Sequence, residues 1–114
     1  METVQGLDEL DDFILRNHET NVIMIYFGAN WCGPCKQLKE RLYDPQTKNI
    51  MPNFNVCYLD VDDENNEMLM KKYKVENLPT QIFIQLNGNK VVEVDRIVGY
   101  DFTRAKLIYD KLAQ

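Results

Sequence analysis

The chain has 114 residues, of which 45% are hydrophobic and 27% are charged. This composition excludes disordered and fibrous proteins, and the length allows one domain over residues 1–114. The 13 basic and 18 acidic residues give a net charge of -5, with the basic residues scattered along the chain. We expect no nucleic-acid partner, because phosphate binding requires clustered lysine and arginine.

Neither a membrane span nor a leader peptide is visible in the sequence. The longest apolar run, Val22 to Phe27, is far shorter than the roughly 20 residues that a membrane-spanning helix needs. The first residues, METVQGLDELDD, are acidic, whereas secretory and mitochondrial leaders are basic. We therefore expect a cytoplasmic, monomeric protein without membrane contact.

The first half of the chain predicts two helices around a buried strand. Apolar residues at helical spacing indicate a helix over 7–17, preceded by a short strand near 3–5. The continuous apolar run over 22–28 is typical of a strand that is covered on both faces. Strong helix formers over 36–43 predict a second helix, which ends before Pro45.

The second half predicts three strands and two helices. A central strand over 55–62 and a short helix over 64–73 precede two strands, over 81–86 and 90–98. The turn between the last two strands contains Asn-Gly, which favours a tight antiparallel hairpin, and a final helix follows. This order predicts an α/β fold in which helices cover both faces of a mixed sheet of four or five strands.

The segment Trp31-Cys32-Gly33-Pro34-Cys35 stands where the buried strand turns into a helix. Unpaired N–H groups and a positive partial charge at a helix start favour a thiolate over a thiol, so we expect Cys32 to be the nucleophile. Pro34 is tolerated in the first helical turn and stiffens the loop between the sulfurs. Cys35 lies one turn later on the same side of the helix, so the two sulfurs can bond.

Cysteines spaced in this way also occur in zinc sites. A structural zinc ion needs about four ligands, and outside the motif only Cys57 and His18 remain as soft ligands, far from it in sequence. Cys57 lies within a predicted central strand, where a free thiol packs as a small apolar side chain. The motif is therefore expected to be a redox centre without a metal.

The motif and the order of elements resemble the thioredoxin family over essentially the whole chain. Leu78-Pro79-Thr80, directly before a strand, matches the family's cis-proline turn, which faces the cysteines and binds substrate backbone. Gly99, after the last strand, matches the glycine that keeps the substrate groove open. The resemblance implies that Trp31 lies on the surface that faces the substrate.

This resemblance implies a protein disulfide reductase that needs no cofactor beyond its own Cys32–Cys35 disulfide. Cys32 would attack a substrate disulfide, and Cys35 would then resolve the mixed disulfide. The partners would be protein disulfides and an electron donor, either similar to thioredoxin reductase or of another kind. The alternative is an interaction module or a dedicated, partner-specific electron carrier with little general reductase activity.

The sequence departs from the family at three places. Many relatives have a buried aspartate and a nearby lysine that help to deprotonate the second cysteine, and here Tyr26 and Tyr58 stand at these positions, as possible proton-relay replacements. Gly28 replaces a common aromatic residue, which predicts a reduced groove wall. Asp44-Pro45-Gln46 interrupts the redox helix and a turn over 49–53 follows, as in thioredoxin-like domains of membrane-linked reductase systems.

Overall fold

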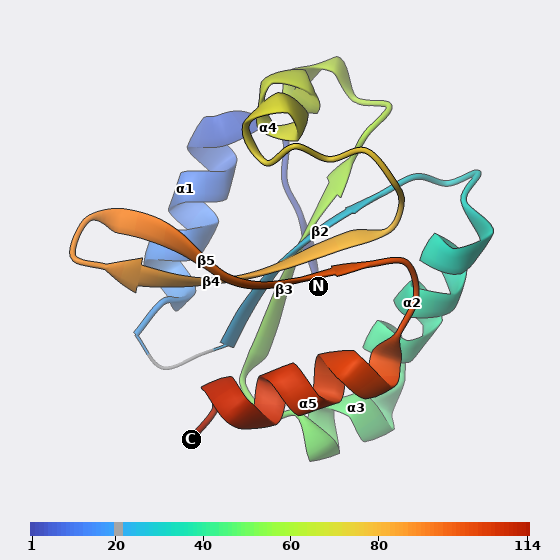
Figure 1. Cartoon of the computed structure of the whole chain (residues 1–114), viewed down its shortest axis with the longest axis vertical. Coiled ribbons are helices and arrows are strands. Elements are labelled where there is room, and N and C mark those ends of the chain that lie inside the picture. The colour runs from blue at the N-terminus through green and yellow to red at the C-terminus, as the bar shows by residue number, and fades with distance from the viewer. Residues whose placement is uncertain (20–21) are drawn as a thin grey trace.

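The structure is a computed structural model that describes residues 1–19 and 22–114. Figure 1 shows the path of the chain. In chain order the described elements are β1 (Glu2–Thr3), α1 (Gly6–Asn17), β2 (Val22–Gly28), α2 (Gly33–Tyr43), α3 (Pro45–Ile50), β3 (Phe54–Asp60), η1 (Glu64–Asn66), α4 (Glu67–Lys72), β4 (Thr80–Asn87), β5 (Lys90–Val98) and α5 (Phe102–Leu112).

The described strands form one five-stranded sheet in the order β1-β3-β2-β4-β5. Strands β1, β3 and β2 run parallel, whereas β4 is antiparallel to both β2 and β5. Helices α1 and α4 cover one face of the sheet, and α2 and α5 cover the other (Figure 1). The expected α/β fold, a mixed sheet with helices on both faces, is therefore confirmed.

Strand β2 lies at the centre of the sheet and supplies the cores on both faces. Every residue of this strand is buried. Met24 and Tyr26 belong to the core under α2 and α5, whereas Ile25 and Phe27 belong to the core under α1 and α4. Because both faces are covered, the strand needs no polar alternation, and this explains the continuous apolar run in the sequence.

Helix α3 is the main difference from the expected elements. The sequence analysis placed an interruption at Asp44-Pro45-Gln46 and a turn over 49–53, but a separate helix begins at Pro45 and ends at Ile50. The carboxylate of Asp44 accepts a hydrogen bond of 2.9 Å from the backbone N–H of Gln46, which caps the new helix. Proline is favoured in a first helical turn, so Pro45 ends α2 and also begins α3.

Smaller differences concern the ends of elements. The expected strand near 3–5 is β1 at Glu2–Thr3, and the expected helix over 64–73 begins as the 3-10 turn η1 before α4. None of the helices in the described parts of the chain has the length and apolarity that a membrane crossing requires.

Gly28, at the end of β2, is in contact with two tyrosine rings. A Cβ atom at this position would lie 2.8 Å from Cε1 of Tyr26 and 3.0 Å from Cε1 of Tyr58. The two rings pack edge to face, with centroids 4.9 Å apart. The tyrosine rings therefore occupy the interior space that a side chain at position 28 would need.

Gly28→Ala should lower the free energy of unfolding by roughly 1–3 kcal/mol, as overpacking of a filled core does. Gly33→Ala is the matched control, because among the described residues, apart from the chain neighbours and the adjacent helix backbone, no atom lies within 4 Å of a Cβ at that position. Chemical denaturation of the wild type and both variants checks this. Equal stability of Gly28→Ala and the wild type would contradict the packing described here.

Cys57 is a fully buried free thiol in β3. Burial raises the pKa of this thiol to about 12, with a smaller contribution from Glu2. The unfolded chain therefore loses this proton at lower pH than the folded chain does. The stability that the protonated thiol contributes is complete below about pH 9 and is lost as the pH rises through about 12.

We expect the free energy of unfolding to decrease as the pH rises from about 9 to about 12, and to decrease less in Cys57→Ala. The measurement uses a Cys32→Ser/Cys35→Ser background, in which Cys57 is the only thiol. Urea denaturation at several alkaline pH values gives the slope of the free energy of unfolding against pH for each protein. If the slope is the same with and without Cys57, the thiol has the same pKa in the folded and the unfolded chain.

Candidate active site

Cys32 caps the N-terminus of α2. Its backbone is extended, with φ -89° and ψ 114°, and the helix begins at the next residue. The backbone N–H of Cys35 donates a hydrogen bond of 3.2 Å to Sγ of Cys32, and the N–H of Lys36 donates to the Cys32 carbonyl at 3.2 Å. The sulfur therefore takes the position of an N-cap acceptor, where a negative charge is stabilised.

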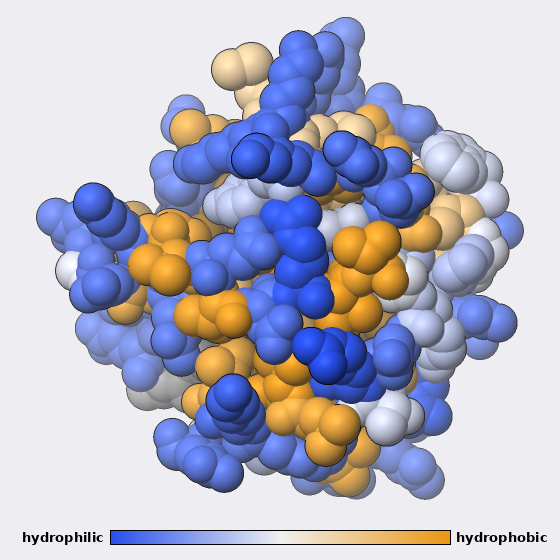
Figure 2. Space-filling model, viewed as in Figure 1, coloured by the Kyte–Doolittle hydropathy of each residue, from blue (hydrophilic) through white to orange (hydrophobic). Residues whose placement is uncertain are grey.

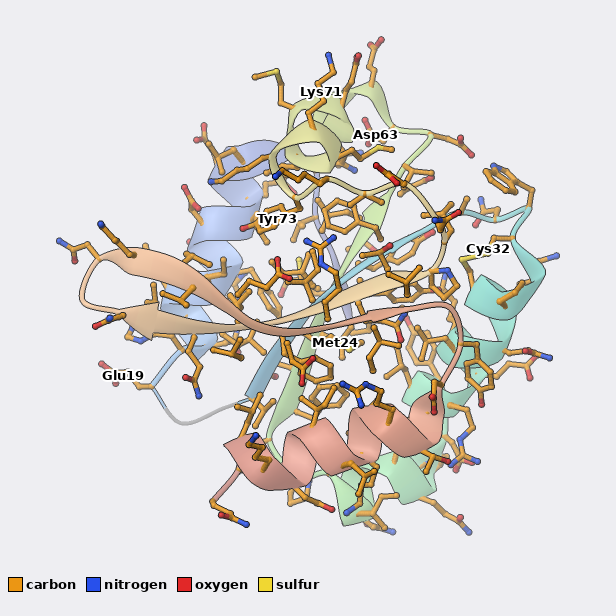
Figure 3. All side chains as sticks on the ribbon, in the orientation of Figure 1. Glu19, Met24, Cys32, Asp63, Lys71 and Tyr73 are labelled. Carbon is orange, nitrogen blue, oxygen red and sulfur yellow. A yellow bond between two sulfur atoms is a disulfide. The ribbon has the colours of Figure 1, made fainter. Side chains whose placement is uncertain are left out.

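Cys32 and Cys35 form a disulfide, with their Cα atoms 5.2 Å apart. Figure 3 places Cys32 at the start of α2. Cys32 is 6% exposed and Cys35 is 2% exposed. Both cysteines are buried, and Cys32 is the more accessible of the two.

Trp31 is largely exposed, which fits the surface position that the resemblance implied. It is 68% exposed, and its indole N–H donates a hydrogen bond of 2.8 Å to the carboxylate of Asp62. Gly33 and Pro34 are also exposed. The sequence analysis did not identify Asp62, which follows β3, because only the parallel register of β2 and β3 brings this segment beside the motif.

The cis-proline turn lies at the same end of the sheet as the motif. The Leu78–Pro79 peptide bond is cis, as the resemblance implied. Thr80, the first residue of β4, is the register partner of Phe27 near the end of β2, which leads into the motif. The side chain of Leu78 packs against the core that contains both motif cysteines. The turn and the cysteines are therefore held at one edge.

Gly99 connects the last strand to this turn. Its backbone N–H donates a hydrogen bond of 2.8 Å to the carbonyl of Pro79. Its φ is 95°, a conformation that glycine adopts readily and other residues rarely adopt. Apart from its chain neighbours, no atom of the described residues lies within 4 Å of a Cβ at this position, so the surface beside Gly99 is open.

Tyr26 contacts the redox helix directly. Its hydroxyl donates a hydrogen bond of 2.8 Å to the backbone carbonyl of Cys35. Burial raises the pKa of Tyr26 well above that of an ordinary phenol, and burial together with Asp60 and Asp62 raises the pKa of Tyr58 to about 12. Both phenols keep their protons near neutral pH, so neither acts there as a carboxylate-like base.

Gln81 is a further site residue that the sequence analysis did not identify. It is fully buried next to the cis-proline turn, and its side-chain NH₂ group donates to three backbone carbonyls. One signal was present in the sequence: Gln81 is a polar residue at the start of a run that is otherwise apolar for several residues. Its partners are visible only in the folded structure.

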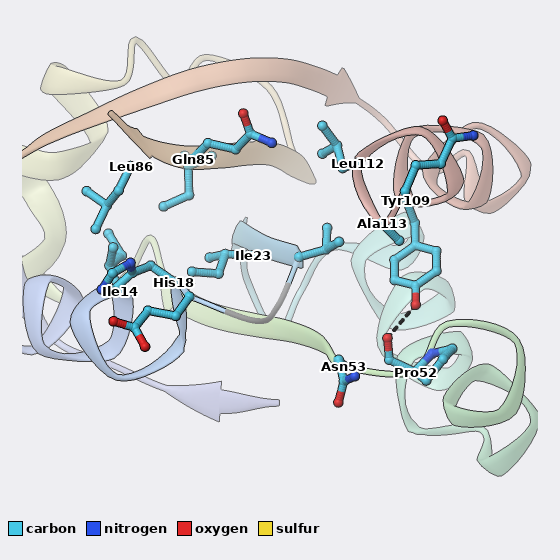
Figure 4. Close-up of a pocket in the computed structure, with 14 residues that line it drawn as sticks. Ile14, His18, Ile23, Pro52, Asn53, Gln85, Leu86, Tyr109, Leu112 and Ala113 are labelled. Atoms are coloured by element: carbon cyan, nitrogen blue, oxygen red, sulfur yellow. Dashed lines mark hydrogen bonds between the residues drawn. The ribbon is translucent and has the colours of Figure 1, made fainter. Parts of the chain in front are cut away.

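A cavity of about 550 Å³ lies away from this site. Its wall includes the start of β2, the residues directly before β3 and the end of α5 (Figure 4). The cysteines, in contrast, follow the end of β2. The hydroxyl of Tyr109 donates to the carbonyl of Pro52 there. No residue of the motif or of the cis-proline turn lines this cavity.

Comparisons with known proteins agree with the site. The sequence model of the family described as Thioredoxin matches residues 4–108. Thioredoxin-1 of Caenorhabditis elegans is 34% identical over 101 residues, which cover 89% of this chain and 83% of that protein. Thioredoxin H2-1 of Oryza sativa subsp. japonica is 36% identical over 95 residues, which cover 82% of this chain.

The chain spans only part of some relatives. It covers 61% of the Oryza protein and 18% of the thiol:disulfide interchange protein DsbD of Haemophilus ducreyi, to which it is 31% identical over 103 residues. That match covers 88% of this chain.

Solved structures show the same fold. The structure of Trichomonas vaginalis thioredoxin matches with a TM-score of 0.82 and 26% identity, covering 98% of this chain and 96% of that one. Fasciola hepatica thioredoxin matches with a TM-score of 0.79 and 31% identity, covering 97% of this chain and 98% of that one. The chain belongs to the thioredoxin family, and its Cys32–Cys35 pair supports thiol–disulfide oxidoreductase function.

Proposed function

We propose that this chain reduces protein disulfides, with Cys32 as the nucleophile and Cys35 as the resolving thiol. The observation that carries the proposal is the hydrogen bond of 3.2 Å from the N–H of Cys35 to Sγ of Cys32. It stabilises a thiolate on Cys32 and keeps the second sulfur within bonding distance of the first.

The proposed reaction has two exchange steps. The Cys32 thiolate attacks one sulfur of the substrate disulfide, a mixed disulfide forms, and the other substrate sulfur leaves as a thiolate that takes up a proton. Cys35 then loses its proton and attacks Sγ of Cys32, which forms the Cys32–Cys35 disulfide and releases the second substrate thiolate. Two electrons and two protons pass from the dithiol to the substrate, and an external dithiol restores the reduced pair.

Exposed apolar side chains near the site suit a protein substrate. Trp31 is 68% exposed, Val98 is 56% exposed and Tyr100 is 38% exposed, and the last two flank Gly99. Figure 2 shows apolar patches among hydrophilic side chains on the face that β5 helps to form. Extended substrate backbone would bind along Pro79 and Gly99. We propose the cytoplasm as the compartment, because thiols are kept reduced there and a reduced donor can restore the dithiol.

A dedicated electron carrier is the second candidate. The match to the DsbD protein of Haemophilus ducreyi, whose name describes thiol:disulfide interchange, supports it. Such a carrier would use the same dithiol but would react slowly with an unrelated disulfide. Reduction of insulin, a general substrate, therefore separates the two candidates.

In the presence of dithiothreitol, the wild-type protein should accelerate insulin precipitation, and Cys32→Ser should reduce the rate to that of dithiothreitol alone, because the attacking thiolate is missing. Cys57→Ala is the matched control and should retain the wild-type rate, since Cys57 is buried in β3. Turbidity measures the rates. Wild-type activity in Cys32→Ser would refute the assignment of the nucleophile.

A further inference from the structure

Two buried, uncharged side chains connect the site to the central strands. Tyr26 on β2 and Gln81 on β4 are register partners in the antiparallel β2–β4 pairing. Both are 0% exposed. Register partners in antiparallel strands project from the same face of a sheet, so both side chains lie on the face that α2 covers.

The hydroxyl of Tyr26 connects β2 to the first turn of α2. Its acceptor, the carbonyl of Cys35, is 2.8 Å away. In the regular helical pattern the same carbonyl also accepts the N–H of Lys39. A carbonyl oxygen has two lone pairs, so it can accept both bonds, and the hydroxyl is an additional donor. The helix would form without this bond. Its effect is to fix the backbone of the resolving cysteine relative to the sheet.

The amide of Gln81 connects the two segments on the substrate side of the site. Its nitrogen lies within hydrogen-bond distance of the carbonyls of Pro79 (3.1 Å), Ile97 (3.3 Å) and Gly99 (3.0 Å), which share its two hydrogens. Since all three neighbours are acceptors, the nitrogen must face them, and this settles the orientation of the amide. One side chain therefore holds the cis-proline turn, the end of β5 and the glycine together.

The oxygen of the same amide has no hydrogen-bond partner among the described residues. A buried, unpaired carbonyl oxygen destabilises the fold, and an apolar side chain at position 81 would avoid this cost. What the amide contributes in return is the three bonds to the segments that would bind substrate backbone.

We propose that Tyr26 and Gln81 are positioning residues with separate effects on disulfide reduction. Tyr26 positions Cys35 for the resolving step, and Gln81 positions Pro79 and Gly99 for substrate binding. This inference rests on the function proposed above. Both residues act without charge, because burial keeps the phenol protonated and the amide does not titrate.

Tyr26→Phe tests the first effect, with Tyr58→Phe as the matched control. Both variants keep the ring, and among the described residues the hydroxyl of Tyr58 makes no hydrogen bond to α2.

Stopped-flow reduction of a peptide disulfide resolves the two exchange steps. The signal is the fluorescence of Trp31, the only tryptophan in the sequence. The resolving step should slow about fivefold in Tyr26→Phe, with KM unchanged and Tyr58→Phe equal to the wild type. If the resolving step in Tyr26→Phe has the wild-type rate, or if Tyr58→Phe slows this step equally, Tyr26 does not position Cys35.

Gln81→Leu tests the second effect, with Gln85→Leu on the exposed part of β4 as the matched control. In Gln81→Leu the KM for insulin should rise about fivefold while the resolving step keeps its rate, and Gln85→Leu should match the wild type. Gln81→Met, which also lacks the amide, replaces Gln81→Leu if that variant does not fold. An unchanged KM in the variant that folds would overturn the role of Gln81.

Amide hydrogen exchange separates a failure of this inference from a failure of the proposed function. Exchange should speed up at Lys39 in Tyr26→Phe and at Gly99 in Gln81→Leu, and neither measurement needs a substrate. If the wild type does not reduce insulin but exchange speeds up at both amides, the proposed function is wrong and the contacts of Tyr26 and Gln81 are confirmed. If the wild type reduces insulin and neither amide responds, the positioning roles fail.

Discussion

The hydrogen bond from the backbone N–H of Cys35 to Sγ of Cys32 is the interaction on which the site depends. It exists because α2 begins at the residue after Cys32, so the sulfur occupies the capping position of the helix. The start of the helix is in turn fixed by β2, which is buried along its whole length and ends shortly before the motif. A strand buried on both faces thus determines where the reactive sulfur lies.

The interior beside the cysteines is uncharged. Among the described residues, the buried polar side chains apart from tyrosine and cysteine are Thr47, Asn66, Thr80 and Gln81. Where the family often has a buried ion pair, this chain packs Tyr26 against Tyr58 over Gly28. Replacing a buried ion pair by well-packed side chains of similar volume is often neutral or stabilising, since two desolvation costs are removed. The tyrosine rings therefore fill the core without introducing a charge, and the start of α2 is the feature that stabilises the Cys32 thiolate.

Sequence reasoning predicted the parts of the structure that depend on local pattern. The apolar run of β2, the Asn-Gly hairpin and the motif at a helix start each follow from residue types at fixed spacing. Helix α3 was missed because Pro45 was interpreted as a helix end, whereas a proline that follows a capping aspartate also begins a helix.

Other features could not be predicted because they depend on tertiary contacts. The three acceptors of Gln81 come from the cis-proline turn, β5 and the glycine after it, which meet only in the folded sheet. The close fit of Gly28 against two tyrosine rings requires the side-by-side register of β2 and β3. A sequence pattern gives the identity of these residues but not the distances between them.

The start of α2 is the feature that favours the Cys32 thiolate, because none of the buried residues described beside the cysteines is charged. The rate at which iodoacetamide alkylates Cys32 in Cys35→Ser, from about pH 5 to about pH 10, tests it most directly, because this variant keeps the N–H at position 35 and removes the second motif thiol. We expect a single ionisation in the rate profile, with Cys57 unreacted in the folded protein because burial raises its pKa to about 12. A second inflection near neutral pH, or alkylation of Cys32 no faster than that of Cys57, would contradict it.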